Sequence, residues 1–171
     1  MTTSSKPSSR NTLQHYTKHH RILLIGEGDF TFARALGAAL GSSANIVATS
    51  FDSLRVATEK YSHLPHTLKE LADARARVLH NVDATRLSSN KALKKEIEDR
   101  GAFHRIVFQF PHIGGSSDDD VQANKDLLDS FFAETVELLA PEGGGEIHVT
   151  LRDTPFYRKW DVEALAAAQG L

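Results

Sequence analysis

RILLIGEGDFT, residues 21–31, is the stretch that decides the fold of this 171-residue chain. Residues 22–25 form a continuous apolar run, which is typical of a short strand buried on both faces of a sheet. The glycines of the following GEG, residues 26–28, predict a tight turn. The Ala- and Leu-rich residues 30–40 then predict a helix that ends at Gly41. A buried strand, a glycine turn and a helix in this order are typical of a parallel α/β sheet.

The same alternation continues to the end of the chain. Further strands are predicted at residues 45–51, 77–81, 104–110 and 145–151. Further helices are predicted at residues 54–61, 67–76, 90–99, 121–139 and 159–169. This pattern predicts one α/β domain with a doubly wound, mainly parallel sheet.

The composition excludes several classes of protein. Hydrophobic residues make up 40% of the chain and charged residues 25%, which is ordinary for a globular domain. The chain has no cysteine, which excludes a disulfide scaffold, a thiolate zinc site and a cysteine nucleophile. No apolar run approaches the roughly 20 residues that cross a bilayer, and the N-terminus has no apolar signal region, so we expect no membrane association.

Charge is distributed unevenly around the net value of −2. Residues 1–21 carry four basic side chains and no acid, and the remainder carries a net charge of −6. Residues 1–20 are rich in Ser and Thr and poor in apolar residues, which predicts a disordered basic tail before a domain at residues 21–171. Such a tail could contact phosphates, or it could serve solubility or targeting.

Ligands of doubly wound sheets bind beyond the carboxyl ends of the strands, so the residues that follow each strand are the first candidates. Gly26 allows the sharp turn after the first strand, and Gly28 allows close approach of a ligand to the backbone. Thr31 replaces the third glycine of a dinucleotide fingerprint, and Glu27 and Asp29 would repel a pyrophosphate. The loop therefore favours a ligand with a cationic or zwitterionic part. The alternative is an ordinary turn in which Asp29 caps the helix.

Acidic residues follow the second and third strands. Asp52 lies 24 positions after Gly28, close to the spacing at which an acid binds ribose hydroxyls. Asp52 and Ser53 could instead cap the next helix. Asp83, followed by Ala84, could accept a hydrogen bond from an adenine amino group, or it could be an ordinary loop acid.

The fourth strand ends in QFPHIGG, residues 109–115. Gln109, Phe110, Pro111 and His112 combine an amide, an aromatic face and an imidazole, which suits a pocket for a planar group. Phe110 could stack on a base. The alternative is a strand end with a Pro-Gly turn.

The sequence supports neither a metal site nor a serine nucleophile. His15 and His19 are four residues apart, as metal ligands on a helix can be, but no acid accompanies them in the sequence. We therefore expect no metal site. A serine nucleophile is not expected either, since the chain has no G-x-S-x-G motif.

Five segments together are more specific than any one of them. They are ILLIGEGDFTFARAL (22–36), NVDAT (81–85), RIVFQFPHIGG (105–115), NKDLLDSFF (124–132) and GGEIHVTLR (144–152). With these segments the chain resembles the Rossmann-like domain of the eukaryotic 25S rRNA uridine-N3 methyltransferases, formerly a domain of unknown function. The resemblance runs from Arg21 to Leu171.

The resemblance implies S-adenosylmethionine as methyl donor and large-subunit rRNA or a pre-ribosome as partner. It implies that residues 26–29 and 52 hold the methionine and ribose parts, and that Asp83 and Ala84 lie near the adenine. It places methyl transfer at residues 109–112. It also implies a nuclear or nucleolar protein, with the cytoplasm as the alternative. A uridine N3 is reachable only in an unpaired or flipped base. His112 is a candidate acceptor of the N3 proton, because an imidazole can be neutral at pH 7.

Two departures from the family pattern leave other functions open. The family usually has Asn before Phe-Pro-His, whereas this chain has Gln109, and a shifted amide can reduce the rate. Sheets of this class usually continue with a sixth and a seventh strand, so we expect a sheet without its last two strands. The alternatives are a non-catalytic module that binds rRNA or protein, a truncated inactive fragment, and a nicotinamide-dependent oxidoreductase. Glu27 and Asp29 disfavour the oxidoreductase.

Overall fold

The computed structural model describes residues 12–141 and 144–171. Its centre is a five-stranded sheet in the order β5-β4-β3-β6-β7, and every neighbouring pair is parallel. The strands are β3 (Ile22–Ile25), β4 (Ile46–Thr49), β5 (Arg77–Leu79), β6 (Arg105–Gln109) and β7 (Glu146–Thr150). The predicted strands and their parallel arrangement are confirmed.

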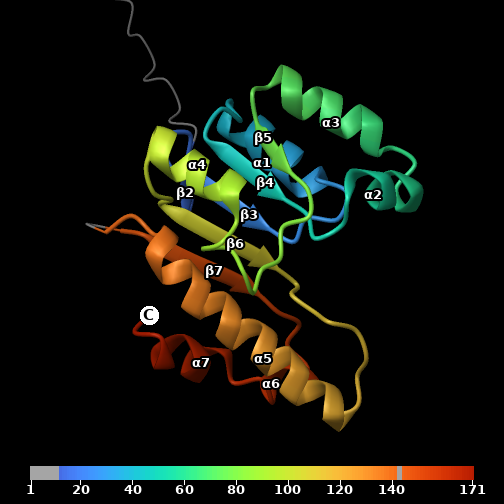
Figure 1. Cartoon of the computed structure of the whole chain (residues 1–171), viewed down its shortest axis with the longest axis vertical. Helices are drawn as coiled ribbons and strands as arrows, with labels where there is room; N and C mark the ends of the chain where they lie inside the picture. The colour runs from blue at the N-terminus through green and yellow to red at the C-terminus, as the bar shows by residue number, and fades with distance from the viewer. Residues whose placement is uncertain (1–11, 142–143) are drawn as a thin grey trace, which may run out of the picture.

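Helices cover both faces of the sheet, as Figure 1 shows. One face packs against α1 (Thr31–Leu40), α2 (Leu54–Lys60) and α3 (Leu64–Asp73). The other packs against α4 (Lys91–Arg100), α5 (Asp118–Thr135) with the short η1 (Val136–Leu138), α6 (Pro155–Arg158) and α7 (Val162–Ala168). The doubly wound α/β architecture is therefore confirmed.

The central strand β3 explains why its sequence is apolar throughout. Ile22 and Leu24 belong to the core on the α1 side, and Leu23 and Ile25 belong to the core on the α5 side. All four side chains are buried. Because successive side chains of a strand point to opposite faces, a strand covered on both faces needs apolar residues at every position.

Three of the predicted helices have wrong boundaries. α3 begins at Leu64 rather than residue 67, because Pro65 fits the first turn of a helix, where no backbone N–H is required. α5 begins at Asp118 rather than residue 121, where Ser117 and Asp120 form a capping box. The helix predicted at residues 159–169 corresponds to α7 alone, which begins at Val162. The short α6 precedes the predicted range, and Asp161 between the two helices has a left-handed φ of 50°.

Residues 12–20 are ordered, and the prediction of a disordered tail is wrong for them. β1 (Thr12–Leu13) and β2 (Tyr16–Thr17) form an antiparallel hairpin. The Nε of Arg105 donates to the His15 carbonyl at 2.9 Å, and the Nδ2 of Asn45 donates to the Lys18 carbonyl at 2.8 Å. These long-range contacts fix the hairpin to the sheet. The predicted tail residues 1–11 lie outside the described part of the chain.

Arg21 does not belong to a free basic segment. Its side chain is buried, and its guanidinium lies 4.9 Å from the centre of the Phe103 ring. It also donates to the Glu96 carbonyl at 3.1 Å. Arg21 is therefore unavailable to an external phosphate.

The order of the strands places the ligand crevice. From β3 the chain continues to β4 and β5 on one side of the sheet and then crosses back to β6 and β7 on the other side of β3. In such sheets the crevice lies at the carboxyl ends of the two strands where the order reverses, here β3 and β6. Among the helices in the described residues, none combines the length and apolar character needed to cross a membrane.

Candidate functional site

A cavity of about 610 Å³ lies at the carboxyl ends of β3 and β6. This volume is in the range of small-molecule sites. Its wall brings together residues from five separate segments of the chain. The predicted site residues in this wall are Gly26, Asp83, Ala84, Gln109, Phe110, Pro111 and His112. Glu27, Gly28, Asp29 and Asp52 are not part of this wall, although they follow β3 and β4 directly.

Gly26 is the residue at which β3 leaves the sheet. Its φ is +69°, in the left-handed region that side chains other than glycine rarely adopt. A Cβ at this position would lie 2.6 Å from Cε2 of Phe108. The Phe108 ring itself packs on Phe131, with ring centres 5.0 Å apart. Both the backbone conformation and the neighbouring ring therefore require glycine here.

Glu27 connects the turn to the start of α1. Its backbone N–H donates to the Thr49 carbonyl at 2.8 Å, and its Oε2 accepts from the backbone N–H of Ala33 at 3.2 Å. Burial raises the pKa of Glu27 to about 7, although the Ala33 hydrogen bond opposes the shift. Near neutral pH this carboxyl therefore exists in both protonation states.

The raised pKa of Glu27 predicts a loss of stability as the pH rises. Between its ordinary pKa of 4.5 and about 7, the folded protein holds a proton that the unfolded chain releases. The free energy of unfolding therefore falls through this window, by about 3 kcal/mol from this group, and the contribution is constant above it. We expect Glu27→Gln to remove this fall. Urea unfolding between pH 4.5 and 8 measures the difference between the two proteins.

The matched control is Glu163→Gln, which neutralises an exposed glutamate of α7. Its unfolding free energy should keep the pH dependence of the unmodified protein. Parallel curves for Glu27→Gln and the unmodified protein would contradict the assignment of a buried, partly protonated carboxyl.

Asp29 stabilises the turn before α1. Its Oδ1 accepts from the backbone N–H of Thr31 at 3.0 Å and from the Thr31 hydroxyl at 2.7 Å, and its Oδ2 lies 2.9 Å from Nε2 of His63. Partial burial opposes ionisation, but the bonds from Thr31 and His63 hold the pKa of Asp29 below its ordinary value. The N-cap position itself is occupied by Phe30, with a φ of 61°, so the alternative of Asp29 as the N-cap residue is wrong in position.

Gly28 and Asp52 lie beside α2. A Cβ on Gly28 would lie 2.8 Å from the hydroxyl of Tyr61. The two oxygens of Asp52 accept from the Nζ of Lys60 at 2.9 and 2.7 Å. Ser53, not Asp52, caps α2, and its hydroxyl accepts from the Val56 N–H at 3.3 Å. The Asp52 carboxylate is thus free of a capping role and is held by a single exposed lysine.

Asp83 enters the cavity wall with the same local geometry as Asp29. Its Oδ1 accepts from the Thr85 N–H at 2.9 Å and from the Thr85 hydroxyl at 2.8 Å. Ala84 is buried beside it. The turn fixes the carboxylate at the carboxyl end of the sheet, where it can accept a hydrogen bond from a ligand.

Gln109 and Phe110 form the end of β6. Gln109 pairs with Thr150 of β7, and the next backbone N–H, that of Phe110, donates to the Thr150 carbonyl at 2.9 Å. Phe110 then adopts a φ of 51°, which turns the chain out of the sheet. Its side chain is 56% exposed, so the ring is accessible to a planar ligand.

His112 lies against three aromatic side chains, two from α6 and one, Trp160, that follows α6. Its ring centre is 6.1 Å from that of Phe156, 5.8 Å from that of Tyr157 and 5.5 Å from that of Trp160. Trp160 is fully buried. These contacts fix the orientation of the imidazole at the cavity wall.

The hydrogen bond of His112 determines what its free nitrogen can do. The Gly114 backbone N–H donates to Nδ1 at 2.7 Å. A neutral imidazole with an occupied Nδ1 lone pair carries its proton on Nε2. In this geometry His112 is a hydrogen-bond donor, which argues against the predicted role as acceptor of the N3 proton.

Several residues of the site were not identified from the sequence. Phe51, Thr85 and Ile113 line the cavity, and Phe51 and Ile113 are 70% and 52% exposed. Phe51 directly precedes the predicted Asp52, so its place after a strand was a usable signal. The aromatic residues at 156, 157 and 160 gave a second signal, because their spacing puts them on one side of a helical turn.

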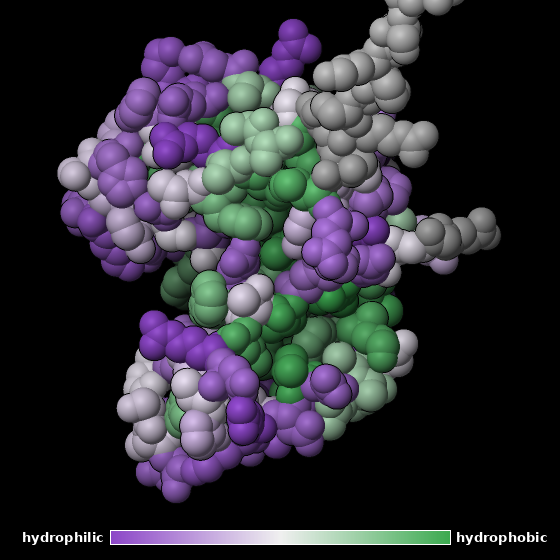
Figure 2. All heavy atoms as spheres, turned by 180° about the vertical axis from the view of Figure 1, so that it is seen from behind, coloured by the Kyte–Doolittle hydropathy of each residue, from purple (hydrophilic) through white to green (hydrophobic). Residues whose placement is uncertain are grey.

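Three exposed apolar side chains line this site, namely Phe51, Phe110 and Ile113. Figure 2 shows a band of hydrophobic surface across the middle of one face of the molecule, with hydrophilic surface above and below it. Exposed apolar side chains beside a cavity are typical of a binding region.

The basic residues after β7 are mostly paired with acids. Arg158 Nε lies 2.6 Å from Asp153 Oδ1, and Lys159 Nζ lies 2.6 Å from Asp118 Oδ1. Arg152 is exposed. A phosphate group that approaches Arg158 or Lys159 would therefore compete with existing ion pairs.

Comparisons with known proteins identify the family to which this chain belongs. A family model described as "rRNA (uridine-N3-)-methyltransferase BTM5-like" matches residues 23–171. The chain is 36% identical to heavy metal-associated isoprenylated plant protein 41 of Arabidopsis thaliana, over 91% of this chain and 30% of that protein. It is 34% identical to uncharacterized protein At4g26485 of the same plant, over 95% of this chain and 78% of that protein.

A further relative has a stated activity. The chain is 28% identical to the 25S rRNA (uridine(2634)-N(3))-methyltransferase of Saccharomyces cerevisiae, over 91% of this chain and 61% of that protein. The chain thus spans less than a third of the first relative and less than two thirds of the yeast enzyme.

Proposed function

Because the chain belongs to the BMT5-like family of rRNA (uridine-N3-)-methyltransferases, we propose that it transfers a methyl group from S-adenosylmethionine to N3 of a uridine in large-subunit rRNA. The observation that carries the proposal is the cavity at the carboxyl ends of β3 and β6, whose wall joins Gly26, Asp83 and residues 109–112. This is the position at which doubly wound sheets bind nucleoside ligands.

The residues around the cavity fit the methyl donor part by part. Gly26 presents bare backbone, and Ala84 and Phe108 supply apolar contacts for a planar base. Asp83 can accept from the adenine amino group with the oxygen that Thr85 does not occupy. Asp52, at the end of the neighbouring strand, can accept from the ribose hydroxyls once it turns from Lys60.

Glu27 suits the methionine end of the donor. Burial disfavours its charged form and raises its pKa to about 7. The α-ammonium group of an amino acid placed beside this carboxyl would favour the charged form and lower the pKa again. The acids at positions 27 and 29 would at the same time repel a dinucleotide pyrophosphate.

The residues at the end of β6 would hold the target base. Phe110 is exposed and can stack on an unpaired uridine, while Pro111 is buried and fixes the path of the chain. Nε2–H of His112 can donate to a uracil carbonyl oxygen, where negative charge grows as N3 releases its proton to solvent water. When bound, S-adenosylmethionine supplies an electrophilic methyl group on a sulfonium centre. The chain's own contribution is to align N3 with that centre and to exclude other geometries.

Asp52→Ala is expected to weaken binding of S-adenosylmethionine at least tenfold. Hydrogen bonds to a charged acceptor contribute about 1.5–3 kcal/mol, which corresponds to roughly 10- to 100-fold in affinity. Isothermal titration calorimetry measures the affinity, and incorporation of a radiolabelled methyl group into large-subunit rRNA measures the activity. Digestion of the product to nucleosides should yield N3-methyluridine.

Lys60→Ala is the matched control, because it removes the ion pair but keeps the carboxylate. Its affinity for S-adenosylmethionine should stay within a few-fold of the unmodified protein. Equal binding by Asp52→Ala and the unmodified protein would reject the ribose assignment. Stabilisation in a thermal-shift assay by NAD but not by S-adenosylmethionine or S-adenosylhomocysteine would reject the proposed function in favour of an oxidoreductase.

The proposed reaction also defines partner and place. A uridine of large-subunit rRNA is available in rRNA or in a pre-ribosome, so the protein would act in the nucleolus or nucleus, or in the cytoplasm on later particles. Gln109, in place of the usual asparagine, lines the cavity and pairs with Thr150 of β7.

A further inference from the structure

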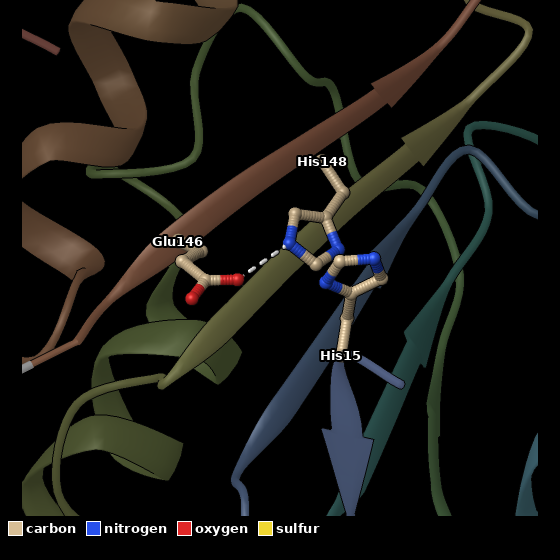
Figure 3. Close-up of side chains that lie close together, drawn as sticks. All are labelled: His15, Glu146 and His148. Atoms are coloured by element: carbon tan, nitrogen blue, oxygen red, sulfur yellow. Dashed lines mark hydrogen bonds and ion pairs between the residues drawn. The ribbon is translucent and has the colours of Figure 1, made fainter. Parts of the chain in front are cut away.

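Three potential metal-binding side chains meet on the hairpin side of the sheet, away from the cavity. His15 lies in the turn between β1 and β2, and Glu146 and His148 lie two residues apart on β7. One ligand atom from each of the three lies within 4.8 Å of the other two. Figure 3 shows the two imidazoles facing each other and the Glu146 carboxylate beside His148.

We propose that His15, Glu146 and His148 form a binding site for one zinc ion. Two imidazole nitrogens and a carboxylate oxygen are a common ligand set for zinc, with bonds of about 2.0–2.2 Å from the ion to each ligand atom. His15 and Glu146 are exposed and His148 is partly buried, so an ion can enter from solvent and a water can complete a tetrahedral shell. Small rotations of the exposed side chains close the remaining separation.

The surroundings prepare the ligand atoms for this role. The Tyr16 hydroxyl lies 2.8 Å from Nδ1 of His148, while Nε2 of the same ring lies 2.9 Å from Oε2 of Glu146. A partner on one ring nitrogen fixes the tautomer and directs the other nitrogen to a metal. Arg105 lies 3.2 Å from Oε1 of Glu146, so this carboxylate would bind the metal through Oε2 alone.

The site is separate from the proposed methyl-transfer cavity. Glu146 is in register with Arg105 at the first position of β6, whereas the cavity is lined by Gln109 at its last position. Zinc would join the N-terminal hairpin to β7. The sequence led us to expect no metal, because no acid lies near His15 and His19. In the folded chain, Glu146 supplies the acid, and His148 rather than His19 is the second histidine beside His15.

The test is a calorimetric titration of the untagged chain with zinc chloride. We expect one ion per chain, and at least tenfold weaker binding for His15→Ala and for His148→Ala. Tyr16→Phe, which removes the partner of Nδ1, should weaken binding by about 10- to 100-fold. Cobalt(II) in place of zinc should give the visible absorption of a tetrahedral site, and this absorption should be absent in His15→Ala.

His19→Ala is the matched control, because it removes an exposed histidine of the same segment that is not in the cluster. Its zinc affinity should equal that of the unmodified protein. Circular dichroism without metal confirms that the variants fold, and His15, being exposed, should be replaceable without loss of structure. Failure of the unmodified protein to bind zinc would overturn the proposal whatever the outcome of the methyl-transfer assay. So would a zinc affinity in His15→Ala and His148→Ala equal to that of the unmodified protein.

Discussion

Replacing Gly26 with alanine is expected to weaken S-adenosylmethionine binding at least tenfold and to lower the free energy of unfolding. A side chain in the left-handed conformation of Gly26 costs about 1–2 kcal/mol. The new Cβ would also lie 2.6 Å from Cε2 of Phe108, and relief of such overpacking costs about 1–3 kcal/mol more. Because Phe108 packs on Phe131, the ring can retreat only toward the cavity. Calorimetry and urea unfolding measure the two effects.

Two further variants separate backbone strain from the clash. Gly170 has a φ of +80°, but a Cβ there would meet nothing within 4 Å among the described residues, so Gly170→Ala should retain full binding. Phe108→Leu should partly compensate for Gly26→Ala, so the double variant should be less destabilised than the two single effects predict together. Additive destabilisation, or unchanged ligand affinity in Gly26→Ala, would contradict the contact as the cause.

Replacing Trp160 with alanine is expected to cost about 3–5 kcal/mol of stability and to abolish methyl transfer. The side chain is fully buried, and its ring centre lies 5.5 Å from that of His112 and 4.7 Å from that of Tyr157. Its loss leaves a cavity beneath the imidazole and releases His112 from its position. Urea unfolding followed by circular dichroism measures the stability, because Trp160 is the single tryptophan of the chain.

Trp160→Phe is the matched variant for this prediction. It keeps an aromatic ring beside His112 and removes an indole N–H that is buried without a hydrogen-bond partner among the described residues. Leaving such a donor unpaired costs about 1–3 kcal/mol, so its removal offsets part of the lost packing. We expect measurable methyl transfer in Trp160→Phe. Equal activity in Trp160→Ala and the unmodified protein would show that His112 needs no aromatic support.

The sequence predicted the sheet well because the decisive signals are local. The apolar residues at 22–25 and the glycines at 26 and 28 describe a buried strand and a tight turn without reference to the rest of the chain. The alternation of such strands with helices then predicts parallel pairing, and the rule for doubly wound sheets predicts where residues 83 and 109–112 meet. The tertiary structure then decides which strand-end residues line the cavity: Asp83 does, whereas Asp52, which follows the strand nearer to β3, does not.

The helix ends and the tail were harder to predict because their signals compete. Pro65 can end one helix or begin the next, and the chain resolves this by starting α3 at Leu64. Residues 12–20 have little apolar character, yet the carbonyls of His15 and Lys18 accept from Arg105 and Asn45. The partners in these two hydrogen bonds are 27 and 90 positions apart in the chain, so local composition gives no sign of them.

The sequence by itself determined the α/β architecture, the strand ends near which the cavity lies, and the resemblance to the rRNA uridine-N3 methyltransferases. Local apolar periodicity and glycine placement suffice for these, because each acts over a few residues. Only the tertiary structure decided the protonation of Glu27, the donor role of His112 and the grouping of His15 with Glu146 and His148. Burial, hydrogen-bond partners and electrostatic neighbours are set by residues far apart in the chain, so these properties exist only after the sheet and its helices have assembled.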